Sequence, residues 1–253
     1  MKLHKIARIF KVSTFIAVTL LCLMIAGCKK EPVENPTNGR TTAVFYPNVG
    51  YGTMTDQDGN IYKTIKIGDQ IWMAENLRTT KFRNGELIPE VTESADWKIS
   101  TTASRCNYKN SLNDENIATF GRLYNWYAIS DSRQLTPAGW HVPSDAEWTT
   151  LVAYLGEALN VGGKLKEAGT THWKSPNELG TNTTGFTGLP AGFRSILGYD
   201  YNLGYFGYWW SSTDISTNEA CYRALTYDFP LVYGNWADFK NKLEGLSIRC
   251  IKD

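Results

Sequence analysis

The sequence contains few of the residues that enzymes most often use for catalysis. Of its three histidines, only His141 and His172 follow residue 27. No G-x-S-x-G motif marks a nucleophile elbow, and Ser144 and Asp145 near His141 are better explained as a helix cap and a first-turn acid. No two carboxylates stand out as the acid and base of a glycosidase. We therefore expect no catalytic residues.

Signals for metals and phosphate groups are incomplete as well. Residues 56–60 read D-Q-D-G-N, like the opening of a calcium loop, but no glutamate stands at the position of the bidentate ligand, so a hairpin turn is favoured. Gly162-Gly163-Lys164 lacks the spacing of a phosphate-binding loop. The cysteines lack the C-x-x-C spacing of zinc sites. The sequence predicts neither a metal site nor a cofactor.

An excess of positive charge is also missing. The first 27 residues carry four basic and no acidic side chains, which leaves 22 basic against 25 acidic residues in the rest of the chain. Proteins that bind nucleic acid need a basic surface. We therefore expect no nucleic-acid partner.

At its start the sequence does contain a targeting signal, residues 1–27. A basic segment precedes an apolar run from Val12 to Ile25, which is shorter than the roughly 20 residues of a membrane span. The run ends in I-A-G-C, small residues before Cys28 as in a bacterial lipobox. We expect cleavage before Cys28, acylation of Cys28 and attachment to a membrane through the acyl chains. An ordinary secretory signal and an uncleaved anchor are the alternatives.

The remaining chain divides at residue 51. Residues 28–51 are rich in Pro, Asn, Thr and Gly and lack periodic apolar residues, so we predict an acylated cysteine followed by a flexible tether. Residues 52–253 are enough for one hydrophobic core and are predicted to form a single domain. The expected location is the cell envelope, at the outer membrane, with the periplasmic or surface face left open.

The strongest local pattern predicts a helix after Ser144. Ser144 and Glu147 have the spacing of a capping box, in which each side chain bonds to the other residue's backbone. Trp148, Leu151 and the following apolar residues at helical spacing form one stripe, and Gly156 supplies the exit. This helix needs a flat apolar surface to pack against.

Weaker patterns complete an α+β prediction. Short helices are expected around Leu123–Ser130 and Gly162–Glu167, and a hairpin is expected through residues 56–73. Alternating segments at 221–227, 231–236 and 246–251 predict three closing antiparallel strands. The expected architecture is therefore short helices packed on small twisted antiparallel sheets with long loops.

Seven segments form a distinctive ordered set. They are TDQDGNIYKTIKIGDQIWMAENLRTTKF, GRLYNWYAI, LTPAGWHVPSDAEWTTL, GGKLKEAGTTHW, NTTGFTGLPAGFRS, GYWWSST and LSIRCIKD. Taken together and in this order, they resemble one protein family, the Fibrobacter succinogenes major paralogous domain. The resemblance runs from about Thr53 to Asp253 and implies a fold similar to C-type lectin-like and formylglycine-generating-enzyme-like domains. The family consists of secreted and lipid-anchored bacterial proteins, and the resemblance implies no particular activity.

Three cysteines remain after the signal and the lipidation site, an odd number for an exported protein. Cys221 and Cys250 lie in strand-like segments, and we predict a Cys221–Cys250 disulfide, which an oxidising envelope permits. Members of the resembled family often carry a cysteine at the position of Thr136, which could pair with the terminal one. Since Thr136 departs from that pattern, Cys106 remains an alternative partner.

The late loops offer candidates for a ligand surface, because flat aromatic rings stack on sugars and carboxylates accept bonds from sugar hydroxyls. Residues 235–238, N-W-A-D, distantly resemble a lectin strand. The predicted function is a non-catalytic envelope module for binding or adhesion, with polysaccharide or envelope protein as partner. The alternatives are an enzyme of the formylglycine-generating or hydrolytic type and a structural lipoprotein that binds proteins. The candidate ligand-binding residues are Tyr205, Tyr208, Asp228, Tyr233, Asn235, Trp236 and Asp238.

Overall fold

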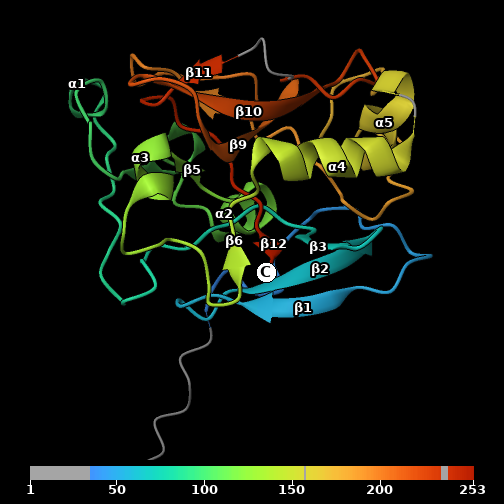
Figure 1. Cartoon of the computed structure of the whole chain (residues 1–253), viewed down its shortest axis with the longest axis horizontal. Helices are drawn as coiled ribbons and strands as arrows, with labels where there is room; N and C mark the ends of the chain where they lie inside the picture. The colour runs from blue at the N-terminus through green and yellow to red at the C-terminus, as the bar shows by residue number, and fades with distance from the viewer. Residues whose placement is uncertain (1–34, 157, 235–238) are drawn as a thin grey trace, which may run out of the picture. The chain divides into compact units, whose positions relative to one another are not determined.

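A computed structural model describes residues 35–156, 158–234 and 239–253 (Figure 1). The signal at residues 1–27 and the acylation site Cys28 lie outside these residues. The described part mixes short helices with small antiparallel sheets, as the sequence predicted. In Figure 1 a five-stranded sheet lies at the bottom and a three-stranded sheet at the top, with helices between and beside them. The helices are α1 (Ser94–Trp97), η1 (Tyr108–Asn110), α2 (Asp114–Phe120), α3 (Trp126–Ser130), α4 (Asp145–Leu155) and α5 (Ala158–Leu165).

The five-stranded sheet begins with the predicted hairpin. Strands β1 (Gly52–Thr55), β2 (Ile61–Ile67) and β3 (Gln70–Met73) pair antiparallel, and β12 (Ile251–Lys252) and β6 (Trp140–His141) extend the sheet. The turn between β1 and β2 is closed by its own side chains. Asp56 accepts bonds from the backbone of Asp58 and Asn60 at 2.9 and 3.0 Å, and from the Asn60 side-chain amide at 2.9 Å. The D-x-D-G-N segment thus acts as a hairpin turn.

The three-stranded sheet has β10 (Glu219–Thr226) at its centre, between β9 (Phe206–Asp214) and β11 (Phe239–Asn241). Two small pairs flank the large sheets, β4 (Arg105–Cys106) with β5 (Leu123–Tyr124), and β7 (Phe193–Arg194) with β8 (Asp200–Tyr201).

The closing strands differ from the prediction. Strand β10 confirms the first of them. The second is represented in the described part by one bridge, between Tyr233 and Ala224, and β11 starts later, at Phe239. Only the end of the third predicted strand, from Ile251, joins a sheet, as β12. Isolated bridges of Leu246 and Ser247 replace the rest, because these residues contact different neighbours in turn.

Helix α4 confirms the strongest local prediction. Ser144 and Glu147 form the capping box, and Gly156 ends the helix with a φ of 100°. Trp148 and Leu151 are buried against the sheets. Helix α5 begins at Ala158, earlier than predicted, and α3 begins at Trp126, because Leu123 belongs to β5. Helix α2 was not among the helices expected from the sequence.

The core consists of two main apolar clusters that together connect the two large sheets. One contains Tyr62 and Met73 from the five-stranded sheet and Tyr208 and Trp210 from β9. The other lies beneath α4 and α5 and includes Trp209. Because side chains alternate along a strand, neighbouring residues of β9 enter different clusters.

Candidate functional site

An aromatic face is the feature of the described surface with the clearest capacity to bind a ligand. It consists of Phe193 from β7, Tyr201 from β8, Phe206 and Tyr208 from β9, and Tyr222 from β10. The ring of Phe193 lies 5.8 Å from Tyr201 and 5.2 Å from Tyr208, and Phe206 stacks on Tyr208 at 5.4 Å with an angle of 7° between the rings. Tyr222 lies 6.1 Å from Tyr208. The rings therefore form a continuous layer.

The strand pairing explains why these rings meet. Phe206 and Tyr208 lie on the same side of β9, because side chains alternate along a strand, and Tyr208 pairs with Ala224 of β10. Because alanine is small, it leaves room for the large ring. Phe193 pairs with Tyr201 in the β7–β8 ladder. Tyr201 is 47% exposed, whereas Tyr208 is 8% exposed, so the layer runs from the surface into the core.

A lysine and a glutamate lie on the inner part of the aromatic face. The Nζ atom of Lys240, from β11, lies 4.5 Å from the ring centre of Phe193, 5.3 Å from Tyr208 and 5.7 Å from Tyr222. It also lies 2.9 Å from Oε2 of Glu244. Burial raises the pKa of Glu244, and the Lys240 ammonium opposes that rise. We call these three rings and Glu244 the cage, with the Lys240 ammonium inside it.

Among the predicted ligand-binding residues that the structure describes, Tyr205 and Tyr208 contact different neighbours. Tyr208 belongs to the aromatic face, but it is mostly buried, and its hydroxyl accepts a bond from Asn202 at 3.4 Å. Tyr205 is exposed and packs against Tyr227 instead, with ring centres 5.2 Å apart. Tyr205 lies just before β9 and Tyr208 lies within it, and the two rings contact different neighbours.

Asp228 and Tyr233 lie in the connection after β10. The Asp228 carboxylate accepts a bond from the Thr226 hydroxyl. Burial raises the pKa of Tyr233, and the charge of Asp228 adds to the rise, so these two predicted residues lie within electrostatic range of each other. Asn235, Trp236 and Asp238 lie outside the described residues.

Sequence analysis missed most of the aromatic face. It named Tyr208 but not Phe193, Tyr201, Phe206 or Tyr222. The alternation of Phe206 and Tyr208 within the Gly- and Tyr-rich segment 199–210 was a signal that could have found two of them. Phe193 of β7 and Tyr222 of β10 join the aromatic face through tertiary contacts, which no pattern in the sequence indicates.

The predicted Cys221–Cys250 disulfide is absent. Cys106, Cys221 and Cys250 are all free and buried. Cys250 lies in the core between the sheets, where its amide contacts the sulfur of Met73 at 3.3 Å. Cys221 lies on the other side of β10, beside Asp145 at the start of α4. The two thiols therefore point into different parts of the core, and the alternative pairing with Cys106 is absent as well.

His141 has no direct bond to the Ser144 hydroxyl. Its Nδ1 lies 2.6 Å from Oδ1 of Asp253, and its Nε2 lies 2.8 Å from Oε1 of Glu147. The Ser144 hydroxyl and amide both bond to the other oxygen of Glu147, at 2.8 Å each. This arrangement fixes the helix cap, in agreement with the interpretation of Ser144 as a cap.

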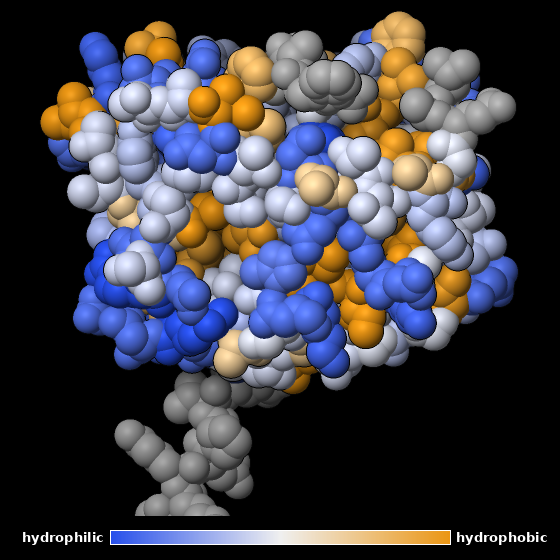
Figure 2. All heavy atoms as spheres, viewed as in Figure 1, coloured by the Kyte–Doolittle hydropathy of each residue, from blue (hydrophilic) through white to orange (hydrophobic). Residues whose placement is uncertain are grey.

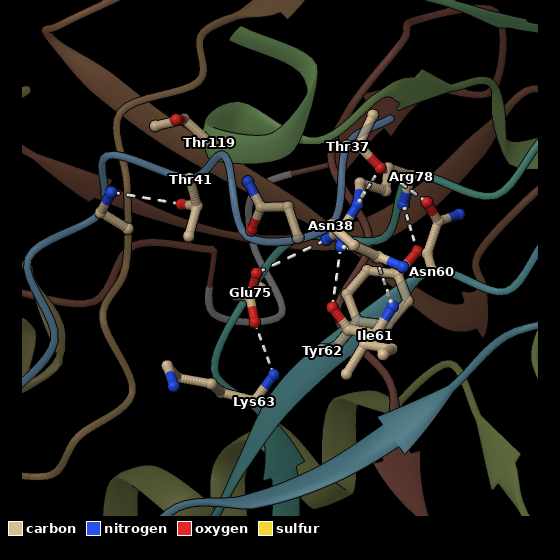
Figure 3. Close-up of polar contacts among 12 residues, drawn as sticks. Thr37, Asn38, Thr41, Asn60, Ile61, Tyr62, Lys63, Glu75, Arg78 and Thr119 are labelled. Carbon is tan, nitrogen blue, oxygen red and sulfur yellow. Dashed lines mark hydrogen bonds and ion pairs between the residues drawn. The ribbon is translucent and has the colours of Figure 1, made fainter. Parts of the chain in front are cut away.

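The Arg78 side chain holds a segment that was predicted to be part of the flexible tether. In Figure 3, Thr37 and Asn38 lie against Arg78 and the β2 strand. Arg78 donates to the Thr37 hydroxyl at 3.0 Å, to Asn38 at 3.3 Å and to the Ile61 carbonyl at 2.8 Å. We call residues 35–46 the strap. Because Thr37 is 5% exposed, the folded part begins before the predicted boundary at residue 51.

The far end of the strap meets a relay of hydroxyl, imidazole and carboxylate. The Thr42 hydroxyl lies 2.9 Å from Nε2 of His172, and Nδ1 of His172 lies 2.8 Å from the buried Glu167 carboxylate. The same groups could make up a hydrolytic triad. A hydrolytic triad also needs N–H donors for an oxyanion. The Thr42 amide donates to Thr119 and the Val44 amide donates to Glu167, so neither of these two amides is available for that role. The relay fastens the strap.

A buried guanidinium joins four of the segments that carried the family resemblance. Arg249 is fully buried, and it donates to Oδ1 of Asn76 at 3.0 Å, to the Thr187 carbonyl at 2.7 Å and to the Phe186 carbonyl. Asn76 also accepts a bond from Trp209 at 2.8 Å. Burial lowers the pKa of Arg249 to about 9. These polar residues therefore connect segments inside the core.

Within residues 35–156, 158–234 and 239–253, no three His, Cys, Asp or Glu side chains are arranged to hold a metal ion. None of the helices in these ranges has both the length and the apolar composition needed to span a bilayer. The face in Figure 2 carries its apolar residues in several small groups separated by hydrophilic ones.

Comparison with known proteins gives one match. The model of the Fibrobacter succinogenes major domain matches residues 65–252, more than half of the chain. No curated protein and no solved structure matches it. The matched region contains the whole aromatic face and the cage, whereas the strap and β1 lie before it.

Proposed function

The chain belongs to the Fibrobacter succinogenes major domain family, and on that premise we propose that it is a lipid-anchored envelope protein whose domain binds glycans without catalysis. We further propose that the fold is C-type lectin-like. Short helices on small twisted antiparallel sheets, joined by long loops, support this assignment. Lipid attachment at Cys28 would hold the domain at the outer membrane.

The aromatic face is the observation that carries the glycan proposal. Aromatic side chains offer apolar faces of fixed geometry, and tyrosine adds a hydroxyl that can bond to a polar ligand. Tyr201 is 47% exposed, and Phe193 and Phe206 are partly exposed beside it. A sugar ring could stack on these rings while its hydroxyls meet Asn202 and the tyrosine hydroxyls. The Tyr199 ring, 56% exposed, lies two residues from Tyr201 and could extend the contact.

The test is glycan binding by the full-length protein in detergent. We expect saturable binding on a glycan array, and calorimetry should show a roughly 3- to 10-fold weaker affinity for Tyr201→Ala and for Phe206→Ala, the range of an aromatic contact. Tyr154→Ala is the matched control, because Tyr154 is 65% exposed on α4, away from the aromatic face. Absence of glycan binding, or equal losses in all three variants, would refute the proposal and leave envelope proteins as partners.

The lipid anchor has its own test. Cys28→Ser should abolish labelling by a radioactive fatty acid and move the protein from the membrane fraction to the soluble fraction, because the acyl chains supply the membrane affinity. Labelling that persists in Cys28→Ser would show that the anchor is attached elsewhere.

The enzyme alternative gains no support from the described thiols. A cysteine needs an accessible thiolate for redox or nucleophilic chemistry. Burial raises the pKa of Cys106 and Cys250 well above the ordinary value, and burial raises the pKa of Cys221 as well. These cysteines have the character of core residues.

A further inference from the structure

The cage has the composition of a binding site for an organic cation. Three aromatic rings and one carboxylate surround a single ammonium, and cations are attracted to ring faces within about 6 Å of the ring centre. All three rings meet that distance from Lys240. Oε2 of Glu244 is buried and has no hydrogen-bond partner among the described residues beyond its ion pair with Lys240. The Lys240 ammonium is therefore the charged partner of this oxygen.

Lys240 is attached so that its side chain can leave the cage. It lies in β11, a three-residue edge strand that pairs only with β10. The Lys240 side chain itself is 19% exposed, so part of it reaches the surface. The lysine side chain is long and flexible, and the strand pairing uses its backbone, which faces Ala220. We expect a rotation of the side chain to carry the ammonium toward the surface while the backbone pairing of β11 stays in place.

We propose that the cage binds the protonated amine of an amino sugar and that Lys240 occupies it as a built-in competitor until that ligand displaces it. This inference rests on the proposed glycan binding and names the sugar class. An amino sugar has both groups that this site can bind, a sugar ring and an ammonium. Its ring can stack on the exposed Tyr201 end of the aromatic face, and its ammonium can take the position of Lys240 beside Glu244.

Competition by Lys240 lowers the apparent affinity of the cage for its ligand. The apparent affinity of a ligand falls in proportion to the fraction of protein whose site is free. If Lys240 fills the cage for about nine-tenths of the time, its removal raises the apparent affinity about tenfold. A neutral ligand that stacks only on Tyr201 gains much less.

The experiment uses the full-length protein in detergent and two probes, a glucosamine tetramer with free amines and its fully N-acetylated form. Calorimetry should show that Lys240→Ala binds the free-amine tetramer about tenfold more tightly than the wild type does. Adding Glu244→Gln to this variant should remove the gain. The N-acetylated tetramer should show no comparable gain. Lys240→Gln, which keeps most of the side-chain length without the charge, should behave like Lys240→Ala if the backbone is undisturbed.

Lys63→Ala is the matched control. The Nζ atom of Lys63 lies 5.1 Å from Phe45 and 5.8 Å from Tyr51, so it also contacts two rings, but it lies outside the cage. Its loss should leave both affinities unchanged. If Lys240→Ala binds the two tetramers with equal affinity, and Tyr201→Ala weakens that binding, the inference about the amine is overturned. The proposal of glycan binding would then still stand. Binding of neither tetramer, with other glycans bound elsewhere, would also overturn it. Binding of no glycan at all would reject both proposals.

Discussion

At the scale of single residues, Arg249 illustrates how a buried cation can stabilise a core. Its donors serve backbone carbonyls that no solvent reaches, and its guanidinium lies 4.1 Å from the ring centre of Phe186. Burial lowers the pKa of Arg249 to about 9, which reflects the cost of removing the charge from water. The hydrogen bonds of Arg249 therefore stabilise the folded state, whereas the burial of its charge destabilises it.

We expect Arg249→Met to lower the free energy of unfolding by roughly 2–4 kcal/mol, because the Phe186 and Thr187 carbonyls lose their donor inside the core. Urea unfolding of the full-length protein measures the change. Arg133→Met is the control. Arg133 also lies over a ring, at 4.0 Å from the ring centre of Phe82, but its side chain is 36% exposed, so its loss should change the midpoint much less. An equal or higher stability for Arg249→Met would mean that the cost of burying the charge is the larger effect.

His141 predicts a dependence of stability on pH. Burial alone would lower its pKa, but the bonds to Asp253 and Glu147 outweigh burial and raise the pKa above the ordinary value of about 6.5. Two carboxylate partners require both ring nitrogens to donate, which favours the protonated ring. A raised pKa in the folded state means that the stabilisation is complete below about pH 6.5 and is lost as the pH rises through the raised value.

The wild type should therefore lose stability as the pH increases above about 6.5, relative to His141→Asn, whose curve should be flatter over that interval. The difference should stay below about 1 kcal/mol, because the side chain is 40% exposed and solvent weakens its ion pairs. Thermal unfolding at a series of pH values measures it. Parallel curves for the two proteins would contradict the assignment.

At the scale of elements, the strap is held by a few side-chain bonds. Thr37 contacts Arg78 and Asn60, and Thr42 contacts Thr119 and His172. Segments held by few contacts open locally without global unfolding. Arg40, an exposed residue between the two attachment points, offers a trypsin site that reports such opening.

Cleavage after Arg40 should be slow in the wild type and about tenfold faster in Thr37→Val, because losing about 1.4 kcal/mol of hydrogen bonding raises the open fraction tenfold. The rate is followed by mass spectrometry under native conditions. Thr53→Val is the control, since Thr53 is exposed in β1 and belongs to neither attachment. Fast cleavage in the wild type, unchanged by Thr37→Val, would show that the strap is not held as described.

At the scale of the whole molecule, the three free cysteines predict a thiol count. The described part should release three thiols to a colorimetric reagent in denaturant and almost none when folded, because all three are buried. Burial also raises the pKa of each thiol, which lowers the reactive thiolate fraction. The test uses protein purified without reductant. A count of one thiol in denaturant would restore the disulfide hypothesis.

The separation along the chain between interacting residues explains which predictions succeeded. Helix α4 was predictable because its cap, its apolar stripe and its terminal glycine lie within 13 residues, from Ser144 to Gly156. The hairpin of β1 and β2 was predictable for the same reason. Arg249 and Asn76 are 173 positions apart in the sequence, and Lys240 meets Phe193 through two different sheets. Such pairs form only when the sheets assemble, so a linear pattern contains no record of them.

The strap has a mechanical consequence. Its attachments, Thr37 to Arg78, Thr42 to His172 and Val44 to Glu167, follow one another along the chain. A pull on residue 35 therefore loads them one after another, and each can yield before the next is stretched. Twelve released residues span roughly 40 Å when fully extended, and this segment is drawn out before tension reaches β1. If the domain is held to a membrane at its N-terminal end, as we propose, the strap extends before the sheet is strained.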